Sequence, residues 1–144
     1  MILRAARSRN RLIVRGEPQE QRQPPRHMVS KVLPMAYTVL EYLTADGVSP
    51  FTKWRARLDV QARRRIDGVI ERFYDGNLGD HKGVGEGVVE TRIDTGPGYR
   101  VYYGRDGHAL VILLAGGSKK TQAKDIEAAK DRWKDYKDRK RRGS

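Results

Sequence analysis

The stretch from residue 88 to residue 118 constrains the fold most, because it holds three extended segments separated by two tight turns. The first two segments alternate apolar and polar residues, as strands with one buried face do. The turns are Gly96-Pro97-Gly98 and Arg105-Asp106-Gly107, where proline and glycine favour chain reversal. The third segment, residues 109–115, is apolar throughout and predicts a central strand covered on both faces. Consecutive hairpins predict a mainly antiparallel sheet.

Alternation also divides the side chains of residues 88–103 between the two faces of this sheet. One face takes the apolar set and a threonine: Val89, Thr91, Ile93, Tyr99, Val101 and Tyr103. The other face takes the charged set and one tyrosine: Glu90, Arg92, Arg100 and Tyr102. Because one tight turn joins their strands, we expect Arg92 and Arg100 to be neighbours on an exposed face.

The segments before and after this sheet predict the remaining elements. Residues 37–43 are rich in β-branched and aromatic side chains and predict a first strand. Ser49-Pro50 and Asp59 are typical helix starts, and each precedes apolar residues at helical spacing. The glycine-rich residues 76–87 predict a loop, and a last helix begins near Thr121. The order β-α-α-β-β-β-α predicts a two-layer α+β domain. Two N-terminal helices pack on a mainly antiparallel four-stranded sheet, and a C-terminal helix follows.

The net charge of +12 is unevenly distributed along the chain. Residues 1–34 and residues 119–144 each carry an excess of six positive charges, whereas residues 35–118 are neutral overall. Residues 1–34 also combine four prolines with few apolar side chains, a composition typical of disorder. We therefore predict a disordered basic leader over residues 1–34, a folded domain over residues 35–136 and a basic tail over residues 137–144. Such basic ends attract polyanions, nucleic acid first among them.

Composition excludes several classes of function. Without cysteine, the chain has no disulfide, no thiolate zinc site and no cysteine nucleophile, and this composition fits the cytoplasm. The longest apolar run, residues 109–115, is far shorter than a membrane helix requires, so we expect no membrane association. The three histidines are scattered, so we expect neither a metal site nor a cofactor.

The cationic face of the predicted sheet suits RNA. Lys82 precedes the first of the three strands, and Lys119 and Lys120 follow the last. Lysine and arginine bind phosphates, and a tyrosine among them can stack on a base. The structural alternative is that Arg92 pairs with Glu90 or Asp94 while the Arg100 stem only covers apolar surface.

Four segments carry a resemblance to a known family: residues 76–85 (GNLGDHKGVG), 89–93 (VETRI), 96–103 (GPGYRVYY) and 113–122 (LLAGGSKKTQ). Together they resemble the phage-derived "addiction module killer" branch of the RelE/ParE toxin superfamily, close to HigB-type toxins. The resemblance covers residues 36 to about 136. It implies helices packed on an antiparallel sheet, and a toxin of a type II toxin–antitoxin system that cleaves messenger RNA on the ribosome.

The resemblance also implies site residues and partners. The catalytic set would be Lys82, Arg92, Arg100 and Lys119. The RNA-binding set would be Tyr102, Tyr103, Lys120 and Gln122. The arginines would stabilise charge, because they do not lose protons, and Lys82 is the candidate base. The partners would be a cognate antitoxin with a helix-turn-helix, the ribosome and messenger RNA.

Two other functions remain open at this point. A ParE-like toxin would bind and inhibit DNA gyrase without cleaving nucleic acid, and an inactive relative would only bind nucleic acid. The clustered cations favour the metal-independent endoribonuclease, because a gyrase inhibitor does not need a cluster of residues that binds phosphate groups.

Overall fold

The computed structural model describes residues 3–5 and 36–143. The elements are β1 (Leu3–Ala5), β2 (Thr38–Tyr42), α2 (Pro50–Ala56), α3 (Val60–Tyr74), β3 (His81–Gly85), β4 (Val88–Ile93), β5 (Tyr99–Asp106), β6 (Leu110–Ser118), the 3-10 turn η2 (Lys119–Thr121) and α4 (Gln122–Arg141). The domain is therefore α+β, as predicted. Of the predicted leader, residues 3–5 form a strand, and its other residues lie outside the described part of the chain.

The sheet has six strands within the described residues, in the order β1-β2-β6-β5-β4-β3. Four of its neighbouring pairs are antiparallel, so the mainly antiparallel prediction is confirmed. The prediction of four strands is wrong, and the sheet is mixed because β2 runs parallel to β6. The apolar strand β6 occupies the interior of the sheet, and residues 111–115 are buried, as their composition predicted.

The predicted loop over residues 76–87 is wrong for its second half, where β3 forms an edge strand. Strand β3 pairs with β4 through a register shift between Gly83 and Gly85. The turn that follows places Glu86 at a φ of 51° and Gly87 at 86°. Glycine-rich sequence has little intrinsic preference for a strand, so pairing with β4 sets this conformation.

Both predicted helix starts are confirmed. The Ser49 side chain accepts a hydrogen bond from the backbone N–H of Thr52, and Pro50 occupies the first turn of α2. The Asp59 side chain accepts one from Ala62 at the start of α3. These caps accept hydrogen bonds from backbone N–H groups of the first helical turn, which have no partner within the helix.

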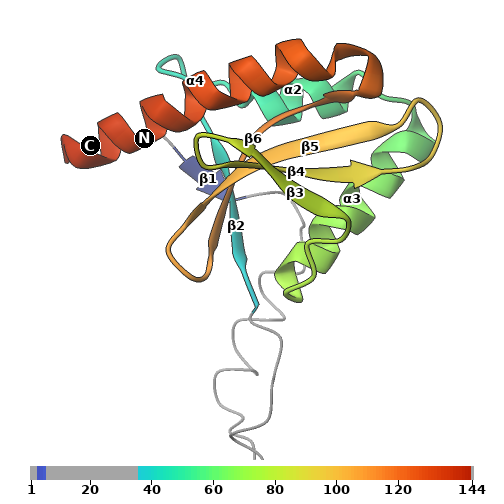
Figure 1. Ribbon diagram of the computed structural model, residues 1–144, viewed down its shortest axis with the longest axis horizontal. Coiled ribbons are helices and arrows are strands. Elements are labelled where there is room, and N and C mark those ends of the chain that lie inside the picture. The colour runs from blue at the N-terminus through green and yellow to red at the C-terminus, as the bar shows by residue number, and fades with distance from the viewer. Residues whose placement is uncertain (1–2, 6–35, 144) are drawn as a thin grey trace, which may run out of the picture.

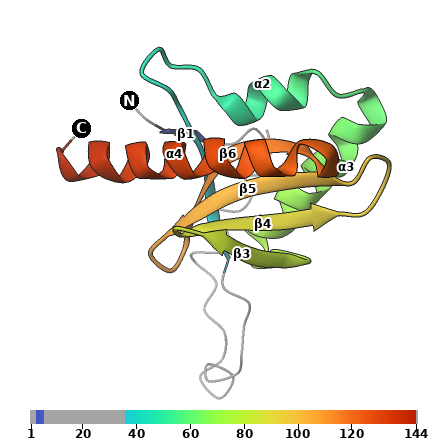
Figure 2. The same cartoon turned by 45° about the horizontal axis from the view of Figure 1, so that its top comes forward.

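The helices cover both faces of the sheet, so the domain has three layers and the two-layer prediction is wrong (Figures 1 and 2). Helices α2 and α3 pack through Phe51, Trp54, Ile66 and Phe73 on one face. Helix α4 crosses the other face, where its apolar side chains build a second cluster with the sheet. That cluster includes Ala129, Trp133, Tyr136, Tyr42, Val88, Tyr102, Ile112 and Leu114.

Helix α4 continues to Arg141, past the predicted start of the basic tail at residue 137. Its last turns are fixed to the sheet by polar contacts. Arg139 donates to the carbonyl oxygen of Leu43 at 3.1 Å, and Lys140 pairs with Asp106 at 2.7 Å. No helix in the described residues has the length and the apolar character of a membrane span.

Candidate anion-binding pocket

A polar pocket of about 490 Å³ opens beside the α4 face of the sheet, at the end where α4 begins. Its lining comes from β3, β4, the β4–β5 loop, β5 and the turn into α4. The lining residues are Lys82, Arg92, Asp94, Thr95, Gly96, Pro97, Gly98, Arg100, Lys119 and Gln122. Five of the eight predicted site residues therefore meet in one pocket, and four of those five are cations.

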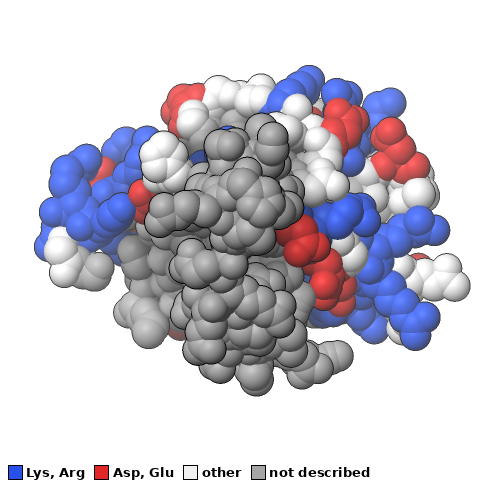
Figure 3. Space-filling model, turned by 90° about the horizontal axis from the view of Figure 1, so that it is seen from below, with Lys and Arg blue, Asp and Glu red and all other residues white. Residues whose placement is uncertain are grey.

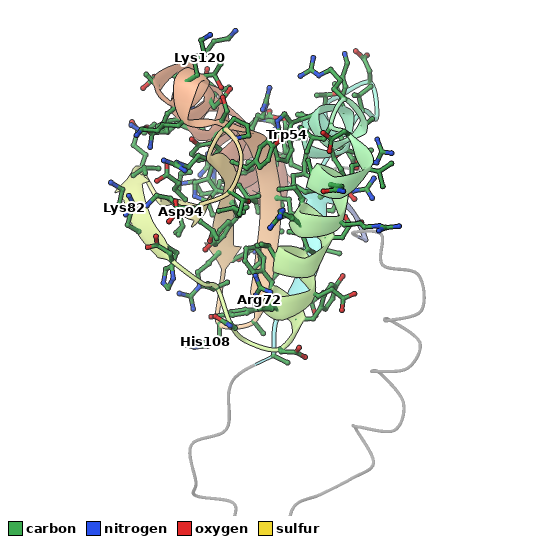
Figure 4. All side chains as sticks on the ribbon, turned by 90° about the vertical axis from the view of Figure 1, so that its right-hand side faces the viewer. Trp54, Arg72, Lys82, Asp94, His108 and Lys120 are labelled. Atoms are coloured by element: carbon green, nitrogen blue, oxygen red, sulfur yellow. The ribbon has the colours of Figure 1, made fainter. Side chains whose placement is uncertain are left out.

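The two arginines are direct neighbours in the sheet, as predicted. Arg92 on β4 and Arg100 on β5 are Cα partners in the antiparallel ladder. Lys82 on the edge strand approaches from the side, and it lies near Asp94 in Figure 4. The sheet register thus brings three cations from three strands to one place.

Arg100 is almost completely buried, with 7% of its side chain exposed. Its Nε lies 3.7 Å from Oε2 of Glu90, which is fully buried. Its Nη1 donates to the carbonyl oxygens of Gly98 and Tyr99 at 3.2 and 3.3 Å. The Arg100 guanidinium is therefore held in place rather than spread over apolar surface.

Arg92 is more open, with 37% of its side chain exposed. Its Nε lies 3.6 Å from a carboxylate oxygen of Asp80, which is itself 59% exposed. The alternative pairing of Arg92 with Glu90 or Asp94 is not seen among the ion pairs of the described residues, because Glu90 pairs with Arg100.

The β4–β5 loop reaches the pocket through a glycine. Gly98 has a φ of +74°, a conformation that other residues rarely adopt. A Cβ at this position would lie 3.5 Å from the Lys119 Cβ and 3.6 Å from the Arg100 Nη1. These are ordinary van der Waals distances, so the positive φ, and not a lack of space, favours glycine here.

The residues after β6 divide into those that face the pocket and those that do not. Lys119 is exposed and lines the pocket. Gln122 also lines it, and its amide donates to the Glu90 carboxylate at 2.5 Å. Lys120 is exposed but outside the lining, and Figure 4 places it well away from Lys82.

Neither predicted stacking tyrosine is available to a base, because Tyr102 and Tyr103 are fully buried. Tyr102 belongs to the cluster beneath α4, where burial first and then the negative charge of Glu90 raise the pKa of its hydroxyl. Tyr103 packs on Phe73 on the opposite face, and burial raises its pKa to about 12. The expectation of a tyrosine on an exposed face is wrong because α4 covers that part of the sheet.

A relative is known for this chain. An uncharacterized protein of Haemophilus influenzae is 48% identical over 81 residues, which are 56% of this chain and 82% of that protein. This chain belongs to the family of that protein. No model of a known protein family matches the chain, and no solved structure matches it.

Sequence reasoning did not include three polar residues of the pocket region among the site residues. Glu90 lies beneath the pocket and binds Gln122 and Arg100. Asp94 and Thr95 line it from the β4–β5 loop. Strand alternation had placed Glu90 on the arginine face, but it gave no reason to expect a fully buried carboxylate there.

The chemistry of the pocket is that of an anion site. Four cations converge on it, and one carboxylate, Asp94, lies in its lining. The two described histidines, His81 and His108, are exposed and outside the lining. Figure 3 shows a further cluster of Lys and Arg where α4 ends, away from the pocket. A phosphate group carries the charge and the acceptor oxygens that such a lining binds.

Proposed function

We propose that this protein is the toxin of a type II toxin–antitoxin system, a RelE-like endoribonuclease that cleaves messenger RNA on the ribosome. One observation carries the proposal: Lys82, Arg92, Arg100 and Lys119, which the family resemblance assigns to catalysis, line a single pocket. They come from three consecutive strands and from the turn after β6, and the register of the sheet brings them together.

The proposed reaction uses the 2′-hydroxyl of the RNA as its nucleophile. The 2′-oxygen attacks the adjacent phosphorus, and the bond from phosphorus to the leaving 5′-oxygen breaks. The products are a 2′,3′-cyclic phosphate and a free 5′-hydroxyl. Lys82 in its neutral form takes the proton of the 2′-hydroxyl, and Lys119 in its protonated form gives a proton to the leaving oxygen. Both lysines are exposed at the pocket and can reach a bound strand.

The two arginines stabilise the negative charge that develops on the phosphorane. They remain protonated throughout, so they act as charge and hydrogen-bond donors only. Arg92 is open to a ligand, whereas Arg100 is held from behind by Glu90. Lys120, which lies outside the pocket lining, contributes to RNA binding beyond the cleavage site.

A ribosome programmed with RNA that carries one 2′-deoxy sugar at the cut site tests the mechanism. We expect cleavage of the all-ribose RNA and no cleavage of the deoxy-substituted RNA. Cleavage of both at the same rate would contradict the 2′-hydroxyl mechanism. Products should end in a 2′,3′-cyclic phosphate or in its hydrolysed form.

Expression in cells distinguishes the nuclease from a gyrase inhibitor. We expect protein synthesis to stop before DNA replication after induction. If replication stops first, the ParE-like function is the correct one. The cognate antitoxin should be a helix-turn-helix protein encoded beside this one, and its association should weaken as salt rises because it covers cationic surface.

A further inference from the structure

Glu90 is a buried acid to which the proposed mechanism gives no role. Its side chain is fully buried on the α4 face of the sheet, and its Cα partner on β3 is the pocket residue Lys82. A buried carboxylate is costly unless charge and hydrogen bonds compensate it. Its contacts therefore indicate what it holds in place.

The contacts of Glu90 connect two elements that meet at the pocket. Oε2 accepts a hydrogen bond from the Gln122 amide at 2.5 Å, and Gln122 begins α4. The same oxygen lies 3.7 Å from Nε of Arg100 on β5. One carboxylate oxygen thus sits between the first turn of α4 and the most buried cation of the pocket.

The nitrogens of Arg100 then divide into fixed and free. Nε lies 3.7 Å from Glu90 Oε2, the distance of an ion pair rather than of a hydrogen bond, and Nη1 donates to the carbonyl oxygens of Gly98 and Tyr99. Nη2 has no hydrogen-bond partner among the described residues, and Arg100 lines the pocket. The side chain is fixed on two sides, and its remaining donor is available to a ligand.

We propose that Glu90 is a positioning residue, whose carboxylate fixes the Arg100 guanidinium so that Nη2 is presented to a phosphate in the pocket. Glu90 touches neither substrate nor reacting atoms and acts through Arg100. Its predicted effect on cleavage rests on the proposed function, whereas its effect on Arg100 does not.

Arg92 and Asp80 provide a matched comparison within the same pocket. Their separation of 3.6 Å is nearly that of Arg100 and Glu90, but both side chains are substantially exposed. Water screens an exposed pair, and such pairs contribute little. Asp80→Asn is therefore the control for Glu90→Gln, because each variant removes one carboxylate beside one arginine.

The decisive measurement is hydrogen exchange with water at the Arg100 Nε–H, followed by NMR in ¹⁵N-labelled full-length protein. The signal is assigned by its loss in Arg100→Lys. We expect Glu90→Gln to speed this exchange at least about tenfold, because a buried guanidinium that has lost its ion-pair partner moves out toward water. Asp80→Asn should leave it unchanged. The Nε–H of Arg55, which donates to Asp67 at 2.7 Å, is the internal reference.

Unchanged Arg100 exchange in Glu90→Gln would overturn the proposal. If Glu90→Gln does not fold, Gln122→Ala replaces it, because it removes the amide that holds the same oxygen. A smaller acceleration at Arg100 is then expected, and unchanged exchange would again overturn the proposal. A general loosening that accelerates Arg55 equally would also contradict it, since it would indicate a purely structural role.

RNA cleavage on ribosomes gives the functional readout. We expect Glu90→Gln to lower kcat about 10- to 100-fold, as loss of the partner that orients a functional side chain does elsewhere. KM should change little, because the other three cations still bind the RNA. If wild-type protein cleaves no RNA, the proposed function fails, while the exchange measurement still decides the role of Glu90. A normal kcat in Glu90→Gln, beside an active wild type, would contradict the positioning role.

Discussion

The same alternating strands build both faces of the sheet, yet the side chains that pack on the two faces differ. The face under α2 and α3 is an apolar core that includes Ile66, Phe73 and Val101. The face under α4 is apolar only where the middle and end of that helix lie, around Trp133. At the start of α4 it becomes cationic and opens into the pocket.

The difference extends to polar atoms that lack partners. Two buried side-chain atoms without a hydrogen bond among the described residues, Arg92 Nε and Arg100 Nε, lie at the pocket end of the α4 face. Each such atom reduces stability. The presence of the pocket therefore lowers the stability of the α4 face at this end.

The largest expected effects come from removing one large ring from each face. Phe73→Ala and Trp133→Ala should each lower the free energy of unfolding by about 3–5 kcal/mol, because both rings are buried. Only Trp133→Ala should also weaken polyanion binding, since it loosens the helix that begins at the pocket. Urea unfolding and binding of a short RNA to the folded protein measure the two quantities. Equal loss of RNA binding in both variants would contradict the division between the faces.

Arg100→Lys should separate activity from stability. It keeps a positive charge opposite Glu90 but loses the Nη2 donor that we propose binds phosphate, so the proposed cleavage should fall about 10²- to 10³-fold. Arg100→Ala, by contrast, leaves a buried carboxylate without its partner and should destabilise the fold by about 3–5 kcal/mol. Cleavage assays beside thermal unfolding make the comparison. Full activity in Arg100→Lys would contradict the role of the Arg100 guanidinium in cleavage.

Two glycines allow helices to approach the sheet, one on each face. A Cβ at Gly104 would lie 2.4 Å from the Trp133 ring, and one at Gly116 would lie 2.1 Å from the Trp54 ring. Gly104→Ala and Gly116→Ala should each destabilise by about 1–3 kcal/mol through overpacking. Gly68→Ala in α3, where a Cβ meets nothing within 4 Å, should stabilise by about 0.5–1 kcal/mol. Denaturant midpoints measure all three, and an unchanged midpoint in Gly104→Ala would show that α4 shifts freely.

The smallest expected effect is a pH dependence of the contacts that fix the far end of α4. Hydrogen bonds from Lys140 and then Tyr136 lower the pKa of Asp106 below its usual value. Such a carboxylate stabilises the fold above its unfolded pKa of about 3.9 and loses that contribution as pH falls through its lower folded pKa. In Asp106→Asn the free energy of unfolding should therefore fall less steeply as the pH drops below about 4. Urea unfolding across this range tests it, and identical slopes in both proteins would contradict it.

Local signals predicted most of the elements. Ser49, Asp59 and the alternation in β4 and β5 act within a few residues of the structure they specify, and each prediction is confirmed. The β3 strand was missed because its glycines carry no strand signal, and pairing with β4 imposes the conformation. The parallel pairing of β2 with β6 was missed because it joins segments far apart in the chain.

The sequence predicted which charged residues lie at the site, but it did not predict which side chains there are buried. Alternation correctly placed Arg92 and Arg100 on one face, because the side-chain period of a strand is two. It could not say what covers that face, and α4 buries Tyr102 while leaving the arginines beside the pocket. The ion pair of Glu90 with Arg100 depends on the register of two strands and on where α4 begins.

The parallel ladder between β2 and β6 has a consequence for how this protein is made. Strand β2 leaves the ribosome well before its partner β6, because α2, α3, β3, β4 and β5 lie between them in the chain. Pairing across so much intervening chain slows folding, typically to milliseconds or longer, because the loop must close before contacts form. Lys119 and Gln122 follow β6 directly, so the pocket also completes only at this stage. A nascent chain therefore stays without its cationic pocket until residue 122 has left the ribosome.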